Sequence, residues 1–158
     1  MTLGTHLLAA VVLAISFHLP VIPAMVGAAL PDIDLKKGLP FRQNRTLFNA
    51  HRGITHHLLW VPLLLILSLY VKDFLNYRVG VWLLSFSLGY ASHLFLDALT
   101  PLGVPYREKY YPRFSFKLFR TGKLGEIFVI LILLFLLIYQ VKTENPSYLQ
   151  ILGLGGLR

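Results

Sequence analysis

The chain has 158 residues, of which 56% are hydrophobic and 14% are charged, and its formal net charge is +8. This length fits one domain, 1–158, and the apolar excess excludes a disordered chain and disfavours an ordinary soluble globule, in which about 25% of residues are charged. The chain has no cysteine, which excludes disulfides, thiolate metal ligands and a cysteine nucleophile.

Four stretches contain no Asp, Glu, Lys or Arg and approach the length of a membrane helix. They are residues 1–31, 53–71, 79–96 and 127–141. A helical span needs about 20 apolar residues, so the last stretch is short unless it extends back to Leu124 and forward to Lys142. The second and fourth stretches have almost no polar stripe, which a helix of a soluble bundle would show. The sequence therefore predicts an all-α integral membrane helical bundle.

The first stretch has two interpretations. It forms either one span over residues 7–30 or a hairpin in which residues 5–17 enter, 18–23 turn and 24–30 return. Pro20 and Pro23 interrupt a continuous helix, and small residues on both arms would allow the arms of a hairpin to pack closely. The bundle then has three spans plus an N-terminal helical hairpin, or four spans.

Positive charges are distributed unevenly among the connecting segments. Residues 32–57 contain five Lys and Arg, and residues 97–126 contain six. Residues 72–78 contain two, and the tail after Val141 contains two. Because cytoplasmic loops are enriched in Lys and Arg, we expect the two large loops on the cytoplasmic side of a multi-pass protein.

Most of the histidines and several aspartates lie at the ends of the apolar stretches. His93 and Asp97 are four residues apart, so on a helix they share a face. Nitrogen and carboxylate ligands without thiolate suit zinc, manganese or non-haem iron. The candidate metal ligands are His6, Asp32, Asp34, His51, His56, His93 and Asp97. The spacing does not choose between Asp32 and Asp34, or between His51 and His56.

The position of His6 depends on the form of the first stretch. In a hairpin, His6 returns to the side of the membrane that carries the other candidates. In a single span it lies about 35 Å away and cannot be a ligand.

Three residues are candidates for the chemistry itself. Asp34 and Asp97 are predicted to bridge metals, orient a ligating histidine or act as a general base. Arg52 is predicted to bind phosphate, since a guanidinium makes bidentate phosphate contacts, although it also fits a plain positive charge of a cytoplasmic loop. We expect one or two Zn²⁺ ions, with Mn²⁺ or Fe²⁺ as alternatives, to activate water.

The segments THLLAA, ALPDID, HRGITHHLL and GYASHLFLDALTPLG resemble the YdjM-like family of LexA-regulated inner-membrane metal-dependent hydrolases. That family is placed near the zinc-dependent phospholipase C and P1 nuclease superfamily, and the resemblance covers about residues 1–105. It implies an α-helical metal site and hydrolysis of phosphoesters. In that match the ligand positions fall on His6, an aspartate of PDID, His51 or His56, and His93 with Asp97. No histidine follows His93, so we expect one or two ions.

The sequence thus predicts an inner-membrane hydrolase with its metal site at the cytoplasmic face. We expect its substrate to be a phosphoester, with a phospholipid as one candidate. Membrane lipids are the expected partners, and no nucleic acid is expected, because aromatic and basic residues beside a bilayer fit an interfacial belt. The alternative is a non-catalytic multi-pass protein that holds a structural metal ion or transports one.

Overall fold

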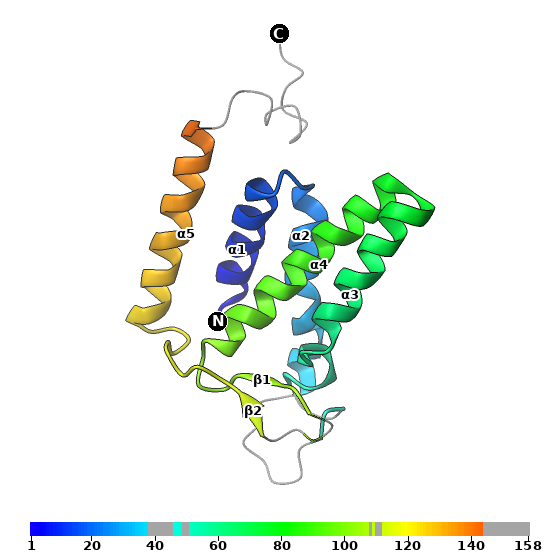
Figure 1. Cartoon of the computed structure of the whole chain (residues 1–158). Coiled ribbons are helices and arrows are strands. Elements are labelled where there is room, and N and C mark those ends of the chain that lie inside the picture. The colour runs from blue at the N-terminus through cyan, green and yellow to red at the C-terminus, as the bar shows by residue number, and fades with distance from the viewer. Residues whose placement is uncertain (38–45, 49–50, 108, 110–111, 144–158) are drawn as a thin grey trace.

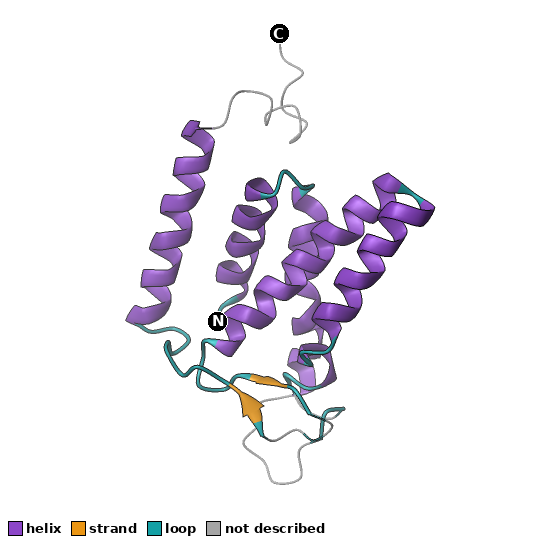
Figure 2. Cartoon of the chain, viewed as in Figure 1, coloured by secondary structure: helices purple, strands orange, loops and turns teal. Residues whose placement is uncertain are grey.

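The computed structural model describes residues 1–37, 46–48, 51–107, 109 and 112–143, and of residues 34–37 it describes the backbone alone. The described part is mostly helical (Figure 1). Its α-helices are α1 (Leu3–Ser16), α2 (Val21–Ala29), α3 (Trp60–Tyr70), α4 (Tyr77–Ala98) and α5 (Leu124–Thr143). Figure 2 shows that strands contribute only one small hairpin, β1 (Val104–Pro105) with β2 (Arg113–Phe114), in which Val104 lies opposite Phe114.

Three shorter helical segments join the main helices. A 3-10 helix, Leu30–Lys37, continues directly from α2, and another, Ile54–His56, precedes α3. A single π-helical segment, Val71–Leu75, follows α3 and leads into α4. These segments matter for function because the first two carry candidate ligands.

Two of the helices, α4 and α5, are long and apolar enough to cross a membrane. The fourth charge-free stretch does extend back to Leu124, as its length requires. The prediction of a helix over the whole of residues 53–71 is wrong: α3 begins only at Trp60 and has 11 residues. The segment before it folds into turns and a 3-10 helix because His56 is drawn into the polar cluster described below.

The first apolar stretch forms the hairpin, and the single span over residues 7–30 is wrong. Helix α1 ends at Ser16, the chain turns through His18 with φ of 54°, and α2 begins at Val21. Pro20 precedes α2 and Pro23 lies in its first turn, where a missing N–H breaks no helical hydrogen bond. The two arms pack through a cluster of buried alanines: Ala10, Ala14, Ala24 and Ala28.

Helix α4 lies at the centre of the bundle and contacts α1, α2 and α3 (Figure 1). Glycines bring α2 and α4 close together. A Cβ atom on Gly89 would overlap the backbone carbonyl of Ala24, and one on Gly27 would overlap that of Phe86. Small residues at a helix interface permit this close approach, and here the approach places the end of α2 against the last turns of α4.

Helix α5 is fastened to the bundle at its N-terminal end. The carboxylate of Glu126 is only 3% exposed and accepts hydrogen bonds from the Thr2 backbone nitrogen (2.6 Å) and the Thr5 hydroxyl (2.7 Å). Its other oxygen accepts a hydrogen bond from the Gly122 nitrogen at 2.6 Å. Glu126 was not among the candidate residues, and its position in the first turn of α5 is where an acidic residue stabilises a helix.

The glycine contact gives a stability test with a matched substitution. We expect Gly89→Ala to lower the free energy of unfolding by about 1–3 kcal/mol, because the new methyl group forces α2 and α4 apart. Gly4→Ala, at a helical position with open space around it, is the control and should be neutral or slightly stabilising. Thermal unfolding in detergent measures both, and equal melting temperatures would contradict the close approach.

Candidate metal centre

Five of the candidate ligands meet at one end of the bundle although they come from four separate parts of the chain. His6 lies in the second turn of α1, and Asp32 lies in the 3-10 helix after α2. His56 ends the 3-10 helix before α3, and His93 and Asp97 lie in the last turns of α4. The sequence predicted that the hairpin and a ligand role for His6 stand or fall together. The structure forms the hairpin and brings His6 to the cluster, and the ligand role itself stays a prediction.

The first group of donors surrounds the ring nitrogens of His56 and His93. The two Nε2 atoms are 3.1 Å apart. The Oδ1 atom of Asp32 lies 3.6 Å from each of them, and the Oδ2 atom of Asp97 lies 3.5 Å from each. A tetrahedral zinc ion with bonds of about 2.0–2.1 Å requires neighbouring donors about 3.3–3.4 Å apart, so these distances suit a metal of that size.

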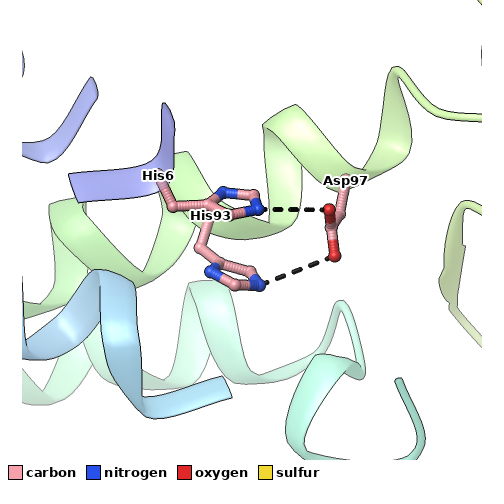
Figure 3. Close-up of side chains that lie close together, drawn as sticks. All are labelled: His6, His93 and Asp97. Atoms are coloured by element: carbon pink, nitrogen blue, oxygen red, sulfur yellow. Dashed lines mark ion pairs between the residues drawn. The ribbon is translucent and has the colours of Figure 1, made fainter. Parts of the chain in front are cut away.

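The second group places His6 beside Asp97. His6 Nε2 is 3.3 Å from Asp97 Oδ1, and the His6 ring stacks on the His93 ring with a centroid distance of 3.7 Å. Figure 3 shows that His6 and His93 point at different oxygens of the same carboxylate. His6, His93 and Asp97 therefore form one set of donors, and Asp32, His56 and His93 form another, with His93 common to both.

Backbone and hydroxyl groups orient the two central imidazoles. The Nδ1 atom of His93 lies 2.7 Å from the carbonyl oxygen of Ala28, which can only accept, so we assign the proton to Nδ1 and the lone pair to Nε2. The Nδ1 atom of His56 is 3.1 Å from the hydroxyl oxygen of Thr55. Partners of this kind fix the tautomer and direction of metal-ligating histidines.

The cluster is closed on all sides except that of Asp32. The side chains of His6, His56, His93 and Asp97 are at most 1% exposed, whereas that of Asp32 is 14% exposed. Burial raises the pKa of Asp32, but its hydrogen bond with His56 and the charges of His93 and His56 outweigh burial, so this pKa lies below the usual value. Asp32 is thus ionised and forms the accessible edge of the cluster.

Two cationic groups neutralise the buried carboxylate of Asp97. The amino nitrogen of Met1 and the Nη2 atom of Arg52 each lie 2.7 Å from Oδ1. Arg52 also donates from Nη1 to the Thr100 hydroxyl at 2.9 Å, and its own carbonyl accepts a hydrogen bond from Arg113 at 3.2 Å. Both terminal guanidinium nitrogens of Arg52 are thus bound to Asp97 and Thr100, and the side chain is only 8% exposed. The phosphate contact expected of Arg52 stays a prediction.

Two other predicted ligands, His51 and Asp34, are not members of the two groups found among the described side chains. His51 is buried and its ring meets the edge of the His56 ring at a centroid distance of 5.4 Å, but it belongs to neither group. The Asp34 side chain lies outside the described residues, so its predicted roles as a ligand and in catalysis remain predictions. Of the alternatives that the spacing left open, Asp32 and His56 lie in the cluster, and the choice between Asp32 and Asp34 stays a prediction.

The donor chemistry fits a divalent cation. Asp97 Oδ2 is buried and has no hydrogen-bond partner, and His6 Nδ1 is in the same situation. Two imidazole nitrogens that face each other at 3.1 Å repel unless a proton or a cation lies between them. With carboxylate oxygens on either side, the residues present suit zinc, manganese or iron bound by nitrogen and oxygen.

Comparison with known proteins yields one match. A family model described as YdjM inner membrane protein matches residues 1–155 of the chain. Neither the curated proteins nor the solved structures that were compared contain a match to the chain.

The ion pair of Arg52 generates a prediction about stability. We expect Arg52→Ala to lower the free energy of unfolding by about 3 kcal/mol, because it removes a buried partner of Asp97. Arg78→Ala, at an exposed position, is the control and should change it by less than about 0.5 kcal/mol. Unfolding in detergent measures both variants. Equal effects would show that Arg52 is an ordinary loop charge.

Proposed function

The chain belongs to the YdjM inner membrane protein family, and we propose that it is a membrane-embedded, metal-dependent hydrolase that acts on a phosphoester. The observation that carries the proposal is the convergence of three histidines and two aspartates, with ring nitrogens oriented toward one another, in a buried cluster with one accessible edge. The resemblance of the sequence to metal-dependent hydrolases supports the same reaction class.

Asp32, His56 and His93 would hold one ion, with Asp97 Oδ2 near both histidines. His6 and the other oxygen of Asp97 form an alternative set that also uses His93. Because only Nε2 of His93 has a free lone pair, His93 would bind an ion in one set at a time. The ion, Zn²⁺ or alternatively Mn²⁺ or Fe²⁺, supplies a Lewis acid that stabilises negative charge on a phosphoryl oxygen and makes water more acidic.

Protein residues would orient the ligands, neutralise the buried charge and accept the proton. Ala28 and Thr55 orient the imidazoles of His93 and His56. Arg52 holds the Asp97 carboxylate and offsets its charge. Asp32 has the accessible carboxylate of the cluster, so its oxygen that does not bind the ion would be placed to accept a proton from an attacking water.

A structural metal site is the second candidate function, and the near-complete burial of four of the donors favours it. A structural site has a full set of protein ligands, and a catalytic site keeps a position open. Removal of the ion would unfold the protein in the first case and would abolish hydrolysis of a folded protein in the second.

Metal content tests the proposal. We expect the protein, purified in detergent without chelators, to contain one or two Zn or Mn ions per chain by plasma mass spectrometry. The double variant His93→Ala/Asp97→Ala should lose them, because it removes His93, which is common to both sets, together with Asp97. His57→Ala is the matched control, since His57 belongs to neither donor set, and it should keep the metal. Protein without metal that regains none on addition of Zn or Mn would overturn the site.

The same preparations test catalysis. The metal-loaded protein should hydrolyse a chromogenic phosphodiester, and Asp32→Asn should lower the rate by about 10²-fold or more. Full metal content with no hydrolysis of any phosphoester, together with unfolding when the ion is removed, would favour the structural site.

We also propose that the cluster faces the cytoplasm of a multi-pass protein. The segment between α4 and α5 is rich in Lys and Arg and lies at the same end of the bundle as the cluster (Figure 1). The connection between α3 and α4 lies at the opposite end and has few positive charges. The positive-inside rule assigns the first end to the cytoplasm.

Cysteine labelling tests this orientation, because the chain has no cysteine of its own. In intact spheroplasts, a membrane-impermeant maleimide should label Asp73→Cys, between α3 and α4. It should label Thr121→Cys, between α4 and α5, only after the membrane is permeabilised. The reverse pattern would place the cluster on the outer side, and labelling of both in intact spheroplasts would contradict a membrane crossing between them.

A further inference from the structure

An apolar groove of about 260 Å³ lies beside the first donor group. It is formed by the end of α2, the 3-10 helix Ile54–His56, the first turns of α3 and the middle of α4, which come together near the cluster (Figure 1). The side chains that line it are Leu30, Ile54, Thr55, Trp60, Leu64, Phe86 and Tyr90.

The few polar atoms of these lining residues are bound within the protein. The Trp60 indole nitrogen donates to the Ile54 carbonyl at 2.9 Å, and the Tyr90 hydroxyl donates to the Thr55 carbonyl. The Thr55 hydroxyl lies 3.1 Å from His56 Nδ1. The surface left facing the groove is therefore hydrocarbon and aromatic, with nothing to bind the hydroxyls of a sugar or the charge of a free phosphate.

Three residues that line the groove are close neighbours in sequence of the three ligands of the first donor group. Leu30 precedes Asp32 by two residues, and Thr55 directly precedes His56. Tyr90 lies one helical turn before His93 on α4. Asp32 is also the accessible edge of the otherwise closed cluster. Thr55, whose hydroxyl lies 3.1 Å from His56 Nδ1, brings the lining of the groove into contact with the first donor group. A molecule with its apolar part in the groove would then direct its polar end toward that group.

We infer that the substrate is an amphiphilic lipid phosphoester, bound with one hydrocarbon chain in this groove and its phosphorus at the cluster. The inference rests on the proposed hydrolase function and adds the substrate class. In the reaction, the oxygen of water bonds to phosphorus, the bond from phosphorus to the leaving oxygen breaks, and a proton passes from the water to that oxygen. The lipid would enter sideways from the bilayer, because outward residues of α3 such as Leu63 and Ile66 are exposed and apolar.

Photolabelling in a bilayer tests groove occupancy without relying on hydrolysis. The full chain is placed in vesicles of phosphatidylethanolamine and phosphatidylglycerol that contain a trace of a phospholipid with a diazirine in its acyl chain. After irradiation, mass spectrometry should find several-fold more label on Ile54, Leu64 and Phe86 than on the lipid-facing Leu63 and Ile66. Label spread evenly over the outer surface of α3 would overturn the inference.

Two neighbouring substitutions make a matched pair. Leu64→Trp fills the groove and should reduce its labelling several-fold, whereas Leu63→Trp, which points outward, should leave it unchanged. Unchanged groove labelling in Leu64→Trp would also overturn the inference. Metal content and melting temperature show whether each variant is folded, and Leu64→Phe replaces Leu64→Trp if the larger ring prevents folding.

Hydrolysis separates failure of the inference from failure of the proposed function. Leu64→Trp should lower hydrolysis of a long-chain lipid phosphoester and leave hydrolysis of a small water-soluble phosphodiester unchanged. If soluble and lipid substrates are affected equally, the groove does not bind the substrate although the hydrolase stands. If the groove is labelled but no phosphoester is cleaved, the groove binds lipid and the proposed hydrolase function is wrong.

Discussion

The structure depends on a carboxylate that is buried at the end of the central helix. Asp97 is about 1% exposed, and an ionised group removed from water in this way must be neutralised by its neighbours. Arg52, His6 and the amino group of Met1 approach one of its oxygens, and His56 and His93 approach the other. These groups come from the start of the chain, from the segment before α3 and from α4 itself, so the neutralisation of Asp97 also ties the bundle together at this end.

Helix packing supplies the precision that the cluster requires. The alanine contacts within the hairpin and the glycine contacts between α2 and α4 bring backbones close together. This close approach places the Ala28 carbonyl within 2.7 Å of His93 Nδ1 and leaves Nε2 directed into the cluster. A larger residue at Gly27 or Gly89 would therefore move the ligand as well as the helix. The close approach of the helix backbones therefore determines both the packing of the bundle and the orientation of the His93 ring.

The location of the cluster relates its chemistry to the bilayer. The helices that surround it are apolar on their outward faces, while the donors lie at the end of the bundle that carries the basic loops. A polar site at a helix end avoids the cost of placing ionised groups in the middle of a membrane. The apolar groove is lined by Leu30 and Thr55, which adjoin the donors Asp32 and His56 in sequence. This arrangement is what a substrate with an apolar chain and a charged head would require.

The sequence by itself determined the helical class, the region of α5, the shared face of His93 and Asp97 and the residue types of the cluster. Each of these follows from local composition or from helical periodicity, which a single sequence records. Only the tertiary structure decided that residues 1–31 form a hairpin, that Asp32 and His56 join the cluster, and that Arg52 pairs with Asp97. Only the tertiary structure likewise showed that α3 begins at Trp60 and that a groove lies beside the cluster. These features depend on contacts between residues distant in sequence, and neither the spacing of PDID nor that of HRGITHH specifies which side chain will face a helix that begins 20 or more residues later.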